Sequence, residues 1–162
     1  MTDEDWMQLA IGLAAKAEAQ GEVPVGAVLV KDNQLIAEGW NQMISSQDPS
    51  AHAEMQAIRE GAKALNNYRL LDCTLYITLE PCSMCAGLMV HSRIKRLVFG
   101  ANDLKTGAAG SVLNIVRQAE FNHQLEVVSG VLASACAEQL SAFFRRRRAE
   151  IKAARLQQRA GE

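Results

Sequence analysis

The chain has 162 residues, of which 49% are hydrophobic and 22% charged, and its formal net charge is −1. This length and composition favour one soluble globular domain over residues 1–162. No run of 18 apolar residues occurs, so we expect no membrane span, and the acidic N-terminus is not followed by an apolar stretch of the kind found in secretory signals. We therefore expect a cytoplasmic protein whose four cysteines are free thiols or metal ligands rather than disulfides.

The charge is unevenly distributed. From Phe143 to the end the chain carries a formal charge of +5, and the remainder carries −6. A basic tail on an acidic body suggests an anionic partner that binds locally, not a protein that is basic over its whole surface.

The first third of the chain predicts one helix and two strands. Apolar residues at helical spacing indicate a helix from about Asp3 to Gln20, with Thr2 as its cap and Gly21 as its stop. A β-branched run predicts a strand over 23–30, followed by a polar turn at 31–34 and a returning strand over 35–40.

The rest of the chain alternates helices and strands. A polar loop over 41–50 precedes a helix from about Ala51 to Leu65, which Ser50 can cap, so His52 and Glu54 are predicted in its first turn. The later elements are a buried central strand over 73–79, a helix over 82–91 opened by Pro81, a strand over 95–100, a long segment over 101–124 with one short helix, a strand over 125–129 and a basic terminal helix over about 132–158. This order predicts a three-layer α/β/α fold with a five-stranded mixed sheet.

Three residues have the chemistry of zinc ligands. Cys82 and Cys85 form a chelating pair at the start of a predicted helix, and His52 can supply a third ligand. Three protein ligands indicate a catalytic zinc site, since a structural site uses four. Glu54 lies about 200° around a regular helix from His52, so we expect it to move protons and not to ligate the same ion.

Blander interpretations of these residues compete with the zinc site. A lone C-x-x-C is also typical of thioredoxin-like redox pairs, and a structural zinc site would need another ligand. His91 lies at the far end of the helix that Cys82 begins, and His123 is expected to pack in the long loop. Cys73 and Cys136 lie among apolar neighbours and are expected in the core.

The pattern H-x-E…P-C-x-x-C is a known signature of zinc-dependent nucleobase deaminases. Beyond it, the chain resembles the bacterial tRNA-specific adenosine deaminases, which have the cytidine deaminase-like fold. The stretches that carry this resemblance are 22–28, 39–41, 48–54, 79–87, 99–101, 105–111 and 143–145.

The resemblance implies hydrolytic deamination of adenosine to inosine at the wobble position (34) of a tRNA anticodon, with release of ammonia. It implies one zinc ion per subunit, a zinc-bound hydroxide that attacks C6, and Glu54 as the proton shuttle. Asn41 resembles the residue that holds the target nucleotide, and Asp103 one near the target ribose. It further implies a homodimer that binds the tRNA anticodon stem-loop, with no organic cofactor.

The basic tail agrees with an RNA substrate. Arg147 and its neighbours can meet phosphates, and Phe143 or Phe144 can offer a face on which a base stacks. The alternatives are that a phenylalanine belongs to the core and that Arg145 to Arg148 form a solvated helix end that interacts favourably with the helix dipole.

Two other functions remain open at the level of sequence. A deaminase of free guanine, cytosine or a nucleoside would use the same metal chemistry. A zinc-stabilised RNA-binding module without catalysis would keep the ligands but would not need Glu54.

Overall fold

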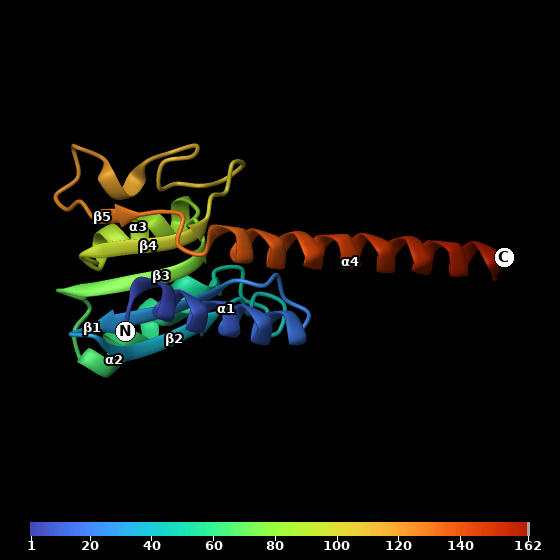
Figure 1. Ribbon diagram of the computed structural model, residues 1–162, viewed down its shortest axis with the longest axis horizontal. Helices are drawn as coiled ribbons and strands as arrows, with labels where there is room; N and C mark the ends of the chain where they lie inside the picture. Colours follow the sequence, from blue (N-terminus) through green and yellow to red (C-terminus); the bar gives the residue numbers. More distant parts are fainter. Residues whose placement is uncertain (162) are drawn as a thin grey trace.

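The computed structural model describes residues 1–161, and the single-domain assignment of residues 1–162 remains a prediction. The described residues form four α-helices, one 3₁₀ helix and five strands (Figure 1). In chain order they are α1 (Asp3–Ala19), β1 (Gly26–Lys31), β2 (Gln34–Trp40), α2 (Ala53–Leu65), β3 (Cys73–Leu79), α3 (Ser83–His91), β4 (Arg96–Ala101), η1 (Ile115–Arg117), β5 (Glu126–Val128) and α4 (Ala133–Ala160).

The strands make one mixed sheet in the order β2-β1-β3-β4-β5. β1 pairs antiparallel with both β2 and β3, whereas β3, β4 and β5 run parallel. The central position of β3 explains its nearly continuous burial.

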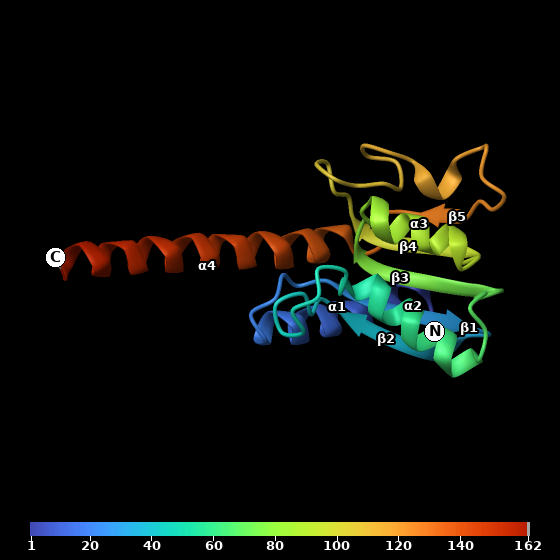
Figure 2. The same ribbon diagram turned by 180° about the vertical axis from the view of Figure 1, so that it is seen from behind.

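Helices cover both faces of the sheet. Figure 1 shows α1 in front of the sheet and α4 extending away from the right-hand side of the sheet, and Figure 2, from behind, shows α2 and α3 on the opposite face. Two apolar clusters match these layers: Trp6, Met7 and Leu13 of α1 pack with Cys136 on one side, and residues of α2 and α3 such as Ile58 and Met89 pack on the other. The predicted three-layer α/β/α fold with a five-stranded mixed sheet is confirmed.

Several local predictions hold because short-range chemistry decides them. Thr2 caps α1 in a reciprocal capping box with Asp5. Gly21 follows the end of α1 with a φ of +80°, a conformation in which glycine carries no steric penalty. Asp32 and Asn33 also have positive φ, as a tight two-residue hairpin turn requires.

The bounds of β1 and α4 differ from the sequence-based expectation. β1 begins at Gly26, not at Val23, because Pro24 has no N–H for the ladder. Before Gly26, the Val23 carbonyl accepts from the Asn41 side chain and the Val25 carbonyl from the Asn41 backbone N–H. α4 continues to Ala160, and beyond Phe143 its described side chains are exposed, so the helix projects away from the body (Figure 1). Within residues 1–161, no helix combines the length and apolar character needed to span a membrane.

Candidate active site

One edge of the sheet collects the predicted site residues. The carboxyl ends of the parallel strands β3 and β4 meet there, and the antiparallel pairing of Ala27 with Ile77 brings the start of β1 to the same edge. The pairing of Gly26 with Trp40 adds the end of β2. The N-termini of α2 and α3 follow directly after segments at this edge, which is where ligands bind in open α/β sheets.

His52 precedes α2 and does not lie in its first turn. Its backbone is extended, with φ −68° and ψ 154°, and it occupies the N-cap position without a capping side-chain hydrogen bond. The side chain of Asn41 takes over part of that role, because its Oδ1 accepts a hydrogen bond of 2.9 Å from the Ala53 N–H. The prediction that Ser50 caps this helix is therefore wrong: the Ser50 hydroxyl donates to Asp48 instead. The His52 imidazole is left free to face the cysteines.

Cys82 and Cys85 flank the start of α3. Cys82 is its N-cap residue, with an extended backbone, and Cys85 lies buried in the first turn. Their Sγ atoms lie 3.7 Å and 3.6 Å from His52 Nδ1. Both cysteines are free thiols, which excludes a Cys82–Cys85 disulfide in this structure.

This cluster has the donor set of a zinc site. The three ligand atoms lie within 4.8 Å of one another, and no further histidine, cysteine or carboxylate joins them among residues 1–161. One imidazole nitrogen and two sulfurs are ligands that zinc prefers, and three protein donors are the number found in catalytic sites. The residues therefore fit the predicted metal.

The electrostatics of the cluster favour a cation. The hydrogen bond from Cys85, assisted by one from His52, lowers the pKa of Cys82 to about 3 against the effect of burial. The same bond, together with burial, raises the pKa of Cys85, and the hydrogen bond to Cys82 raises that of His52. A lowered pKa favours the Cys82 thiolate, which is the form of cysteine that binds a metal ion.

Glu54 is a buried carboxyl group beside this cluster. Its side chain is 4% exposed, and burial raises its pKa to about 7. Glu54, His52 and Cys82 line one small cavity of about 160 Å³. A carboxyl group with such a pKa can accept and release a proton near neutral pH.

Asn41 and Asp103 both line the same cavity. Asn41 is buried, and besides accepting from Ala53 it donates to the Val23 carbonyl at 3.1 Å. The Asp103 carboxylate accepts from the Thr106 hydroxyl at 2.8 Å and from the Lys105 backbone N–H at 3.0 Å. These contacts place both residues in the cavity wall, and their substrate contacts remain predictions.

Comparison with known proteins decides the family. Residues 1–101 match the family model of the cytidine and deoxycytidylate deaminase zinc-binding region. The chain is 60% identical over 151 residues to the tRNA-specific adenosine deaminase of Haemophilus influenzae, covering 93% of this chain and 87% of the relative. It is 53% identical over 153 residues to that of Bacillus subtilis, covering 94% and 95%.

The chain belongs to the tRNA-specific adenosine deaminase family. This confirms the predicted resemblance and makes the protein a hydrolytic deaminase.

Solved structures agree with this family. One, from a study of A-to-I editing by tRNA:A34 deaminases at the wobble position of transfer RNA, matches with a TM-score of 0.81 and 43% identity over 84% of this chain and 99% of the other. The guanine deaminase of Bacillus subtilis matches with a TM-score of 0.62 and 37% identity, over 78% and 83% of the two chains.

Glu80 also lines this cavity, and the sequence reasoning does not identify it. It is 2% exposed, and its carboxylate accepts from the backbone N–H groups of Asp103, Ala109 and Ser111 at 3.0, 3.0 and 3.1 Å. The Ser111 hydroxyl and the Asn102 amide also donate to it. Burial alone would raise the pKa of Glu80, but these bonds outweigh burial and lower it. One carboxylate thus holds the loop that carries Asp103.

Glu22 holds the loop between β2 and α2 in the same way, through hydrogen bonds from backbone N–H groups of that loop. It is fully buried and accepts from the backbone N–H groups of Ile44 and Ser45 at 3.1 and 2.7 Å. Burial would raise its pKa, and the hydrogen bonds lower it in net effect. The signal in the sequence was a lone charge beside an apolar strand, as in Gly21-Glu22-Val23 and Leu79-Glu80-Pro81.

A basic groove adjoins the cavity. Phe143 is buried and Phe144 is 44% exposed, so only Phe144 offers a free ring. Phe144 and Lys105 line two hollows: one of about 500 Å³ with Arg145 and Arg148, and one of about 470 Å³ that includes Asp103. These hollows form the groove.

Arg147 lies outside the groove lining. Its guanidinium lies over the Phe143 ring, 5.4 Å from the centroid. Its predicted substrate contact stays a prediction.

The other two histidines lie elsewhere, as the sequence suggests. His91 is exposed at the end of α3. His123 Nε2 lies 2.6 Å from the Ile94 carbonyl oxygen and packs its loop against the body.

Proposed function

We propose that this enzyme converts adenosine to inosine at the wobble position (34) of a tRNA anticodon, releasing ammonia. The observation that carries the proposal is the buried Glu54 beside the His52–Cys82–Cys85 cluster, in a small cavity that opens toward a basic groove. The names of the most similar relatives support the same substrate.

We assign His52, Cys82 and Cys85 as the ligands of one zinc ion per chain. Zinc, when bound, lowers the pKa of a water molecule from near 16 to about 7 and so makes a nucleophile available at neutral pH. No other His, Cys, Asp or Glu side chain among residues 1–161 joins the cluster, which agrees with a catalytic and not a structural site.

Glu54 moves the protons in this proposal. Hydrolytic deamination adds water at C6 and breaks the bond between C6 and the exocyclic nitrogen. Glu54 takes a proton from the attacking water, delivers it to the ring nitrogen and assists the departure of ammonia. The raised pKa of about 7 suits a group that must both accept and release a proton.

The geometry favours an unpaired base as substrate. The cavity has a volume of about 160 Å³, and Val25, Asn41 and Glu54 in its wall are buried, so a base must leave any stack to enter it. An anticodon loop offers such a base at low cost, since single-stranded loops are where proteins read RNA sequence. The exposed Phe144 and the cations of Lys105, Arg145 and Arg148 lie in the adjoining groove, where sugar and phosphates would follow.

We also propose that the enzyme is a homodimer in the cytoplasm, where a tRNA substrate would be met. The outer side of α2 and α3 carries a hollow of about 320 Å³, whose lining combines the apolar side chains of Met55, Ile58, Ala62 and Leu88 with Arg59, His91 and Ser92. Tyr68 at its rim is 71% exposed. A second subunit on this face would bury that surface.

A deaminase of free bases is the second candidate, favoured by the structural likeness to a guanine deaminase. The two candidates separate when the zinc-loaded protein is incubated with an anticodon stem-loop, with guanine and with cytidine. We expect conversion of the wobble adenosine in the stem-loop. Conversion of a free base without conversion of the stem-loop would refute the tRNA function.

A further inference from the structure

The projecting part of α4, after Phe143, carries several Lys and Arg side chains that do not line the catalytic cavity. The described side chains after Phe143 are exposed, and this segment holds seven Lys and Arg residues. A solvent-exposed helix segment that packs against no other element is a candidate surface for a binding partner.

Five of these cations share one face. They are Arg145, Arg148, Lys152, Arg155 and Arg159. The spacing between neighbours alternates between three and four residues, so at 100° per residue all five lie within an arc of about 80°. We call this set the cationic face. Its length, from Arg145 to Arg159, is about 21 Å at 1.5 Å per residue.

The free charges lie along the middle of this face. Arg145 is paired with Glu138 at 2.7 Å. Arg148, Lys152 and Arg155 make no ion pair with any carboxylate within residues 1–161. Glu150, the acidic residue nearest to them in sequence, pairs with Arg146 on another side of the helix.

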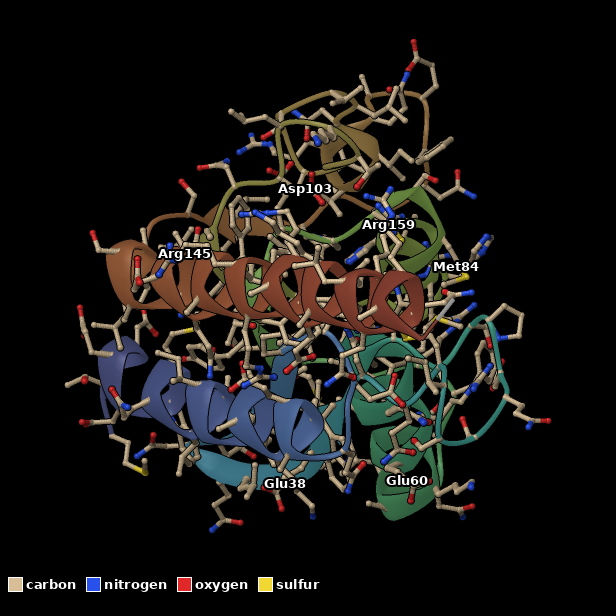
Figure 3. The ribbon with its side chains drawn as sticks, turned by 90° about the vertical axis from the view of Figure 1, so that its right-hand side faces the viewer. Glu38, Glu60, Met84, Asp103, Arg145 and Arg159 are labelled. Carbon is tan, nitrogen blue, oxygen red and sulfur yellow. The ribbon has the colours of Figure 1, made fainter. Side chains whose placement is uncertain are left out.

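The cationic face is continuous with the candidate active site. Its first members, Arg145 and Arg148, line the groove with Lys105 and Phe144. Lys105 and Phe144 in turn share the next hollow with Asp103, which lines the catalytic cavity. In Figure 3, Arg145 and Arg159 mark the two ends of the face, and the loop with Asp103 lies above the same helix.

We propose that the cationic face binds the phosphates of the paired stem of the RNA while the loop nucleotides enter the cavity. This inference rests on the proposed RNA substrate and extends it from the loop to the stem. A duplex strand carries on the order of one phosphate per 3.4 Å of axis, so the face runs alongside about six phosphates. A helix end that merely offsets the helix dipole would concentrate its cations in the last turn, whereas these cover four turns on one side.

Two variants of the zinc-loaded full chain test whether binding depends on the position of the cations on this face or only on the net charge of the helix. The neutral variant is Lys152→Gln with Arg155→Gln. The rotated variant is Lys152→Ala, Ala153→Lys, Arg155→Gln and Gln157→Arg, which keeps the composition of charge but moves two cations by about 100° and 200° around the helix. All four positions are exposed, and Ala, Gln, Lys and Arg are good helix formers, so the helix is retained.

The readout is the dissociation constant for an anticodon stem-loop with a full stem and for one closed by two base pairs, across a salt series. For the full stem, we expect both variants to bind about three- to tenfold more weakly than wild type, with the salt slope of the neutral variant shallower by about 2. For the short stem, the deficit should be much smaller. A rotated variant that binds the full stem as wild type does, or an equal deficit on both RNAs, would overturn the inference.

The proposed function is decided separately. Deamination of the full-stem RNA by the wild-type protein tests the tRNA substrate, and affinity alone tests the cationic face. A wild type that binds but never deaminates would refute the function, and a wild type that deaminates with no deficit in either variant would refute only the face.

Discussion

At the scale of single residues, two buried carboxylates organise the walls of the cavity. Glu22 fixes the loop before α2, and Glu80 fixes the loop after β4. Neither reaches the position of a metal ligand in the cluster of three. Both satisfy backbone N–H groups that would otherwise be buried without a partner, which is costly.

Replacing Glu80 should therefore destabilise the protein strongly. In Glu80→Ala, three backbone N–H groups lose their acceptor, and we expect the free energy of unfolding to fall by about 3 kcal/mol. Urea titration measures this change. Glu38→Ala, at an exposed position of β2 labelled in Figure 3, is the control and should change stability by less than about 0.5 kcal/mol. Equal stability of the two variants would show that Glu80 does not hold the loop.

At the scale of elements, the approach of α2 to the sheet places His52 and Glu54. A Cβ on Gly39 of β2 would overlap the Ala53 carbonyl oxygen and lie 2.6 Å from the Ala57 nitrogen. Only glycine permits this contact, so α2 lies directly on β2 with its first turn at the cavity.

Gly39→Ala should push α2 away from the sheet. We expect lower stability, by about 1–3 kcal/mol, and weaker zinc retention, because His52 moves relative to the cysteines. Gly12→Ala is the matched control: Gly12 lies in α1 with nothing within 4 Å of the added Cβ, and the change should stabilise the helix slightly. Thermal unfolding and zinc content of the purified variants report both effects, and a harmless Gly39→Ala would contradict the close packing.

The elements also show where sequence reasoning succeeds. The strand over Cys73–Leu79 follows directly from its apolar run, and the capping of α1 from Thr2 and Asp5. The predicted start of α2 is wrong because its first N–H group is satisfied by Asn41, twelve residues away, and not by the local Ser50. The sequence does not predict the roles of Glu22 and Glu80 for the same reason, since their hydrogen-bond partners lie 22 to 31 residues away.

At the scale of the whole molecule, charged contacts join distant parts of the chain. Arg96 of β4 donates to both oxygens of Asp3 in α1, at 2.8 and 2.6 Å, and Tyr76 donates to Asp3 at 2.7 Å. The hydrogen bond from Arg96, with that from Tyr76 and against the effect of burial, lowers the pKa of Asp3 below its ordinary 3.8.

This lowered pKa has a definite consequence in acid. The ionised Asp3 is stabilising at any pH above its unfolded value of about 3.8, and the contribution is lost as pH falls through the lower folded pKa. We expect the stability difference between wild type and Asp3→Asn to be constant near neutral pH and to shrink below about pH 4. Urea titrations of both proteins at each pH measure it. A difference that stays unchanged into strong acid would mean that this carboxylate is not charged in the fold.

The central claim is that Glu54 moves protons beside a zinc ion held by His52, Cys82 and Cys85. The most direct test compares wild type, Glu54→Ala and the control Glu60→Ala, an exposed position of the same helix labelled in Figure 3, for zinc content, stem-loop affinity and inosine formation by mass spectrometry. We predict that Glu54→Ala keeps one zinc per chain and binds the stem-loop, but loses inosine formation by about 10²- to 10⁴-fold, while Glu60→Ala behaves as wild type. Inosine formation by zinc-loaded Glu54→Ala at the wild-type rate would contradict the claim.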